Sequence, residues 1–248
     1  MIFVVDSGST KTDWIALDDS GEILFSTQTL GLNPQVLPSA ILTERIINNY
    51  DLYQNREKVS HVYFYGAGCG VESPAGRIEK VFTEIFTQSN FSILEDTYAA
   101  VYAATQPNNP AIVCIMGTGS NCTYFDGKEI EQRITSLGYV LMDEASGNFY
   151  GKQLIRAYYF KTMPEALAKK FEDQYDLSPD QIKENVYRKE NPNTYLAKFA
   201  KFIIEHKQVP EMKTIIEDGF QRFLSHQILQ FDDATEVPIH FIGSIAHY

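Results

Sequence analysis

The chain has 248 residues, 44% of them apolar and 13% aromatic, which is enough to build buried cores in one large domain or two ordinary ones. A formal net charge of -11 argues against a nucleic-acid binder, because phosphate backbones require clustered Lys and Arg. The apolar run before Asp6, Ile2 to Val5, has only four residues and no later run reaches membrane length, so neither a signal peptide nor a membrane span is expected. The chain has an odd number of cysteines, and their spacing is irregular: Cys69, Cys114 and Cys122. This pattern is typical of free thiols in a reducing compartment. We expect a cytoplasmic protein with a small-molecule partner.

The first part of the chain predicts three consecutive strands, then helices alternating with strands. Leu42, Ile46 and Tyr50 recur at four-residue steps, which indicates one face of a helix. The clearest helix follows Ser73, which can cap it, and Pro74, which suits a first turn. The expected strands are 2–5, 12–17, 22–29, 61–65 and 91–94, and the expected helices begin near residues 38, 73 and 97.

The same order of elements begins again after the proline-rich segment 107–110. Strands are expected over 111–116, 121–125 and 239–242, with Asp126-Gly127 as a hairpin turn leading to another. A long helical region over about 147–231 is interrupted near its prolines, Pro164, Pro179, Pro192 and Pro210. We therefore predict two domains, 1–106 and 107–248, with a helical insertion in the second.

Two loops of similar design each join a strand that enters to a strand that leaves. The first is 6–12 and the second is 116–121, and both are rich in Gly, Ser and Thr. Such loops let the backbone approach an anion and direct several N–H groups at it, although Ser and Gly are also common in ordinary turns. In the first loop Lys11 can face a phosphate and Asp6 can hold Mg²⁺. Two such loops favour a clamp on the phosphates of one nucleotide.

Three other polar positions each admit a structural and a functional interpretation. Asp96 follows a strand and opens a helix, so it can cap that helix or take a proton from an attacking hydroxyl. Asp143, beside Glu144, can cap the next helix or accept hydrogen bonds from the hydroxyls of a sugar. Asn33 is a turn residue before Pro34 or a second polyol contact. Spacing alone leaves these alternatives open.

Together these segments resemble the BadF/BadG/BcrA/BcrD ATPase group of the sugar-kinase, actin and heat-shock-chaperone ATPase superfamily, a group that includes N-acetylglucosamine kinase. The resemblance covers essentially the whole chain. It rests on the two loops, on Asp96 with the alanines after it, on segment 117–122 followed by 143–147, and on segment 243–246, which looks like the adenosine motif. It implies an α/β fold of two duplicated ribonuclease-H-like (actin-like ATPase) domains, each a mixed five-stranded sheet flanked by helices, with a cleft between them.

The resemblance also implies roles for individual residues. Asp96 would be the catalytic base, and Asp6 would hold Mg²⁺. The implied nucleotide contacts are Asp6, Gly8, Ser9, Thr10, Lys11, Thr12, Gly117, Thr118, Gly119, Gly243 and Ser244. The implied sugar contacts are Asn33, Ser120, Asn121, Ser136, Leu137, Gly138 and Asp143. The cofactors would be ATP and Mg²⁺, and a homodimer is one oligomeric state left open.

The sequence thus predicts an ATP-dependent kinase acting on the 6-hydroxyl of N-acetylglucosamine or a related amino sugar. It departs from such kinases at Met142, where they have glycine, and it stops where they continue with a final helix. One alternative is an ATPase that activates a dehydratase, but this would need cysteines arranged around an iron–sulfur cluster between subunits. Another is a catalytically silent sensor that binds sugar or nucleotide.

Overall fold

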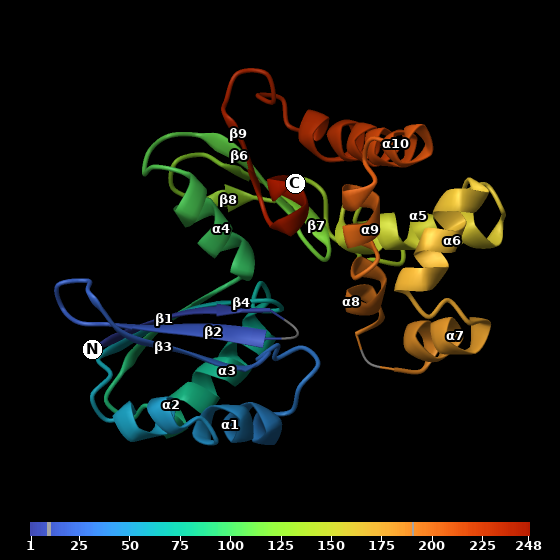
Figure 1. Cartoon of the computed structure of the whole chain (residues 1–248). Coiled ribbons are helices and arrows are strands. Elements are labelled where there is room, and N and C mark those ends of the chain that lie inside the picture. Colours follow the sequence, from blue (N-terminus) through green and yellow to red (C-terminus); the bar gives the residue numbers. More distant parts are fainter. Residues whose placement is uncertain (9–10, 190) are drawn as a thin grey trace. The chain divides into compact units, whose positions relative to one another are not determined.

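A computed structural model describes residues 1–8, 11–189 and 191–248 of the chain. These residues form two compact units, Met1–Ala103 and Ala104–Tyr248 (Figure 1). Ser9 and Thr10, two predicted nucleotide contacts, lie outside the described residues. None of the helices described is long and apolar enough to cross a membrane.

The first unit is a five-stranded sheet with helices α1, α2 and α3 along one face (Figure 1). The strand order is β3-β2-β1-β4-β5, antiparallel from β1 to β3 and parallel from β1 to β5. This matches the predicted mixed sheet. The strands are β1 (Ile2–Ser7), β2 (Lys11–Leu17), β3 (Ile23–Leu30), β4 (His61–Gly66) and β5 (Asn90–Leu94). The helices are α1 (Ser39–Ile47), α2 (Tyr50–Asn55), α3 (Glu72–Ile85) and α4 (Asp96–Ala104).

Two helix boundaries differ from those expected in this unit. The predicted helix from residue 38 is split in two, because the Asn49 side chain accepts a hydrogen bond from the Leu52 N–H (3.1 Å) and starts α2. Helix α3 begins at Glu72, so Ser73 lies inside the first turn and Val71 occupies the cap position without a side-chain cap. The apolar pattern therefore predicts where the helices lie, but the residues at which they begin and end differ from those expected.

Alternation along the strands separates a core face from a polar face in this sheet. Phe3 and Trp14 are fully buried, and their rings meet edge to face with centroids 5.8 Å apart. Phe82 of α3 and Phe86, which directly follows that helix, pack against the same aromatic cluster. Because side chains alternate along a strand, Asp6 points to the face opposite Phe3. At the end of β1, Asp6 is thus directed away from the core, whereas Ser7 is buried on the core face.

The second unit repeats the first part of this topology. Its sheet has the order β8-β7-β6-β9, with β6–β7 and β7–β8 antiparallel and β6–β9 parallel, as in β3-β2-β1-β4. Four strands are described here rather than the five predicted; β9 is followed by helix α11 (Ser244–His247), as β4 is followed by α3. The strands are β6 (Ala111–Met116), β7 (Ser120–Phe125), β8 (Ile130–Glu131) and β9 (Ile239–Ile242).

Six α-helices and a short 3-10 helix of this unit, among its described residues, lie between β8 and β9 in the chain. The predicted breaks are confirmed: Pro179, Pro192 and Pro210 each open a helix, and Pro164 caps one. The elements are α5 (Gly147–Tyr159), α6 (Glu165–Gln174), α7 (Pro179–Tyr187), α8 (Pro192–Ala197), α9 (Ala200–Glu205), α10 (Pro210–His226) and η1 (Ile228–Gln230). Helix α5 packs against α8 through Gly151, where a Cβ would lie 1.8 Å from the Leu196 carbonyl oxygen. This close packing fixes α5, which carries part of the candidate site.

Candidate functional site

The first loop joins the ends of β1 and β2. The Gly8 N–H donates to the Lys11 carbonyl oxygen (3.0 Å), and Lys11 Nζ lies 2.8 Å from Asp13 Oδ2. The hydroxyl of Thr12 is turned into the fully buried face, where it bonds to Ser7 Oγ (2.8 Å). Gly8 and Lys11 therefore border the segment expected to hold phosphate, while the Thr12 side chain stabilises the base of the loop.

Asp6 and Asp13 form a carboxylate pair beside this loop. They are register partners on neighbouring antiparallel strands and so share one face of the sheet. The pKa of Asp6 is raised, first by partial loss of hydration and then by Asp13, while Lys11 lowers it. No group of three His, Cys, Asp or Glu is arranged as a metal site among the described residues. A carboxylate with an acidic neighbour nevertheless fits Mg²⁺, which is commonly held by one or two carboxylates together with substrate phosphates.

Asp96 opens α4 at the carboxyl end of β5. Burial raises its pKa to about 6, and the negative charges of Glu95 and Asp6 add to this effect. Hydrogen bonds from the backbone N–H groups of Thr97 and Asp96 itself oppose it. The Asp96 carboxylate therefore fits both roles considered from the sequence, helix cap and base. It accepts hydrogen bonds from N–H groups at the start of the helix, and its raised pKa suits a base near neutral pH.

The glycine-rich segment after β4 contacts both Asn33 and Glu95, the residue before Asp96. A Cβ on Gly68 would lie 2.5 Å from Asn33 Oδ1, and the φ of Gly68 is +83°, a conformation that glycine adopts without strain. The Glu95 carboxylate accepts hydrogen bonds from the N–H groups of Gly68 and Gly70. Sequence analysis did not single out Glu95, since its partners lie some 25 residues away; the only signal was the glycine-rich end of the strand.

The second loop joins β6 to β7 and is held by the start of α5. Within the loop the Gly117 N–H donates to the Gly119 carbonyl (2.9 Å). From α5, the Gly147 N–H donates to the Gly117 carbonyl (2.8 Å) and the Asn148 N–H to the Thr118 carbonyl (3.0 Å). Loop carbonyls thus satisfy the first N–H groups of the helix, which gives the loop a rigid base.

Asp143 is buried directly against this loop. Its Oδ2 accepts from Asn148 Nδ2 (2.8 Å), and its carboxylate also accepts from the Ser120 N–H. A Cβ on Gly119 would lie 2.8 Å from Asp143 Oδ2, so the approach depends on glycine. Burial raises the pKa of Asp143, while the hydrogen bonds from Asn148 and Ser120 lower it. The cap of α5 is Ser146, which accepts from the Phe149 N–H, so the capping interpretation of Asp143 is wrong.

The predicted sugar contacts of segment 136–138 lie in more exposed surroundings than the buried Ser120. Leu137 is 58% exposed, and its N–H points to Met142 Sδ (3.3 Å). Ser136 is also exposed, and Gly138 has a φ of +78° in the same turn. Ser120 donates to the Glu144 carbonyl (2.7 Å). The hydrogen-bond partners described for Asp143 are Asn148 and Ser120, and none of them lies in segment 136–138.

Two further predicted residues lie at the edges of the second loop. Gly243 has a φ of +116°, and a Cβ there would lie 2.4 Å from the Met116 carbonyl oxygen. Gly243, in the segment predicted to be an adenosine motif, therefore lies against the start of the loop, and Ser244 follows as the first residue of α11. Asn121 Oδ1 accepts from the Thr123 hydroxyl (3.1 Å) on β7.

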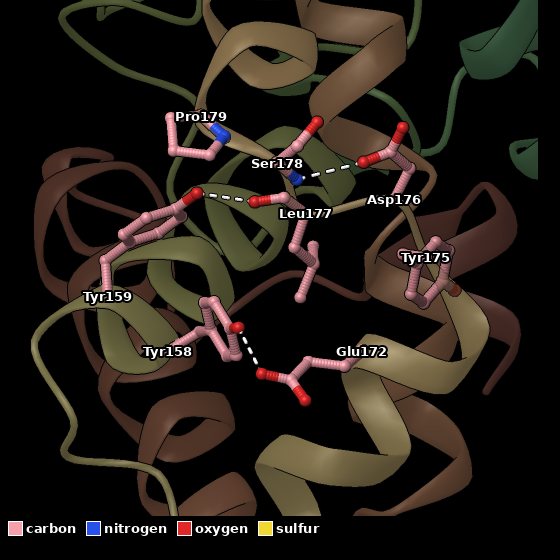
Figure 2. A pocket seen from close by; sticks show the side chains of 8 residues that line it. All are labelled: Tyr158, Tyr159, Glu172, Tyr175, Asp176, Leu177, Ser178 and Pro179. Atoms are coloured by element: carbon pink, nitrogen blue, oxygen red, sulfur yellow. Dashed lines mark hydrogen bonds between the residues drawn. The ribbon is translucent and has the colours of Figure 1, made fainter.

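A separate hollow of about 460 Å³ lies among α5, α6 and the start of α7 (Figure 2). Its polar groups pair with one another: the Tyr158 hydroxyl donates to Glu172, the Tyr159 hydroxyl to the Leu177 carbonyl, and the Ser178 N–H to Asp176. None of the predicted site residues lines it. The candidate site is therefore placed at the two strand-to-strand loops and not in this hollow.

The two loops and the repeated strand order can be compared with those of known protein families. The model of the BadF/BadG/BcrA/BcrD ATPase family matches residues 5–215. The chain belongs to this family. The match covers most of the first sheet and strands β6 to β8 of the second, and it confirms the family recognised from the sequence and with it the actin-like fold class.

Solved structures agree with membership of this ATPase family. A proposed N-acetylglucosamine kinase from Porphyromonas gingivalis is 34% identical over 100% of this chain and 87% of its own, with a TM-score of 0.88. Another from Chromobacterium violaceum shares 18% identity over 99% and 88% of the two chains, with a TM-score of 0.68. A ROK family glucokinase from Streptomyces griseus in complex with glucose and AMPPNP shares 14% identity over 97% and 93%, with a TM-score of 0.52. The last two show the fold alone.

Proposed function

We propose that the protein is an ATP-dependent kinase that phosphorylates the 6-hydroxyl of N-acetylglucosamine or a related amino sugar. The observation that carries the proposal is Asp96, a buried carboxylate with a pKa of about 6 at the end of β5. The name of the Porphyromonas gingivalis relative, at 34% identity over the full chain, supports the substrate class.

The nucleotide is assigned to the two loops. Phosphoryl transfer requires positioning and charge neutralisation more than covalent chemistry from the protein. Lys11 would supply positive charge, and the backbone N–H groups of Thr118 and Gly119 in the second loop would supply donors to the phosphates, since the N–H groups of Gly8 and Gly117 already donate within their own loops. Asp6 would hold Mg²⁺, which supplies neutralisation of the phosphate charge when bound.

The sugar is assigned to Asn33 and Asp143, with Asp96 as the base. Asp143 is fixed by Asn148 and Ser120, so its carboxylate is oriented before any hydroxyl donates to it. As the sugar oxygen forms its bond to the γ-phosphorus and the bond to ADP breaks, the hydroxyl proton passes to a carboxylate oxygen of Asp96. The products are the sugar 6-phosphate and ADP.

The test of this assignment is Asp96→Asn, followed by coupled ADP release with saturating ATP and N-acetylglucosamine. Losing the base should lower kcat by about 10² to 10⁴ while the affinity for ATP stays nearly unchanged. Asp51→Asn, at an exposed carboxylate in the first turn of α2, is the matched control and should keep full turnover. Full turnover in Asp96→Asn would refute the role of Asp96.

The alternative of a dehydratase activator has no support from the cysteines. Cys69, Cys114 and Cys122 are all free and buried. The last two face each other inside the second sheet, with their sulfurs 3.6 Å apart. Thiols that share an iron–sulfur cluster between subunits must reach a subunit surface, and burial prevents this.

A further inference from the structure

Asn148, the second residue of α5, joins two parts of the candidate site through one side-chain amide. It is fully buried. Its Nδ2 donates to the Thr118 carbonyl oxygen (2.7 Å) and to Asp143 Oδ2 (2.8 Å). Thr118 belongs to the loop assigned to the nucleotide, and Asp143 is assigned to the sugar. The two protons of a single NH₂ group therefore bridge them.

The orientation of this amide follows from its neighbours. Both partners of Nδ2 are acceptors, a carbonyl and a carboxylate, so the reversed amide would place oxygen against oxygen twice. In this orientation Asn148 Oδ1 is buried and has no hydrogen-bond partner among the described residues. An unmet buried acceptor is unfavourable and needs an explanation other than stability.

Other hydrogen bonds also hold the loop, at Gly117, Thr118 and Ser120, but none of those described joins the Thr118 carbonyl to the Asp143 carboxylate. The Gly147 N–H holds the Gly117 carbonyl, and the backbone N–H of Asn148 holds the Thr118 carbonyl, so the loop would stay anchored to α5 without the amide. The Ser120 N–H contacts the Asp143 carboxylate from the strand. What the amide alone adds is a direct connection from the Thr118 carbonyl to the Asp143 carboxylate.

We propose that Asn148 is a positioning residue that couples nucleotide binding to sugar binding. The inference rests on the proposed function, in which Thr118 borders the phosphates and Asp143 contacts the sugar. A ligand that orders either side of the bridge also orders the shared amide, so the second ligand meets a partner already in place. Each ligand should then tighten the binding of the other by the same factor.

The direct test is calorimetric titration of N-acetylglucosamine, with and without saturating AMPPNP and Mg²⁺. In the unmodified protein the nucleotide should lower the Kd of the sugar about tenfold, within the range typical of coupled sites. In Asn148→Ala this factor should fall below about twofold, because the bridge is gone while the backbone anchors remain. Asn185→Ala, which removes an amide donating only to the Gln181 carbonyl of its own helix, should keep the wild-type factor.

A second measurement needs no variant and covers the case in which Asn148→Ala does not fold. The side-chain NH₂ resonances of Asn148 should shift on addition of AMPPNP alone and of N-acetylglucosamine alone, because the amide touches both parts of the site. A shift with only one ligand, or with neither, would overturn the inference. So would an undiminished coupling factor in folded Asn148→Ala.

These readouts separate the inference from the proposed function. Binding coupled through Asn148 without any sugar-dependent ADP release would refute the kinase and leave the coupling standing. Sugar phosphorylation with no coupling in the unmodified protein would refute the coupling and leave the kinase standing.

Discussion

Asp96 shows how a single buried residue acquires a proton affinity that differs from its ordinary value. Its pKa of about 6 results first from burial and then from the charges of Glu95 and Asp6. A base must be ionised before it can accept a proton, so this group is active above pH 6 and inactive below it. In the folded state the raised pKa also means that protonation stabilises the protein, an effect present at low pH and lost as the pH rises through about 6.

The pH dependence of turnover follows from this. At low sugar concentration, kcat/KM for the sugar should fall about tenfold for each pH unit below a midpoint near 6, because this constant reports the pKa of Asp96 before the sugar binds. Glu95→Gln should move the midpoint to lower pH, because it removes the nearest negative charge that raises the pKa of Asp96. The exposed Asp51→Asn variant should leave it unchanged. A kcat/KM for the sugar that stays constant from about pH 7 to pH 5 would contradict Asp96 as the base.

At the scale of elements, the sequence predicted what local patterns determine. Apolar runs located the strands, including β6 at residues 111–116, and prolines marked the helix breaks. The cap of α5 was missed because Asp143 and Ser146 are equally plausible caps until the chain is folded. Glu95 and Asn148 were missed because their partners are distant in sequence: Thr118 lies 30 residues from Asn148. Contacts of that kind leave no spacing signal in a single chain.

The second loop permits a matched test of this packing. Gly119→Ala would place a Cβ 2.8 Å from Asp143 Oδ2 and push the carboxylate from its position, whereas a Cβ on Gly117 meets nothing within 4 Å. Gly119→Ala should therefore raise the KM for sugar about tenfold or more, on the scale of a misplaced binding group. Gly117→Ala should leave it within about twofold. Both constants come from initial rates at saturating ATP, and equal KM values in the two variants would contradict the arrangement.

At the scale of the whole molecule, one topology is used twice. The order β3-β2-β1-β4 recurs as β8-β7-β6-β9, so each strand-to-strand loop occupies the same place in its own unit. The family and the repeated α/β sheets could be predicted from the two loops and the strand order around them. The number of strands in the second sheet could not, because the fifth strand was expected from the resemblance and no apolar run after Ile239–Ile242 indicates one. The two loops also differ chemically: the first lies beside Lys11, Asp6 and Asp13, and the second is packed against Asp143.

The central claim is that this ATPase-family protein transfers phosphate to an amino sugar. The most direct test measures ADP release with Mg²⁺ and ATP against N-acetylglucosamine, glucosamine, N-acetylmannosamine and glucose, with the products identified by phosphorus NMR. We predict sugar-dependent ADP release, the highest kcat/KM with N-acetylglucosamine or another amino sugar of the panel, and phosphate on the 6-oxygen. ADP release at the same rate with and without every sugar would contradict the account.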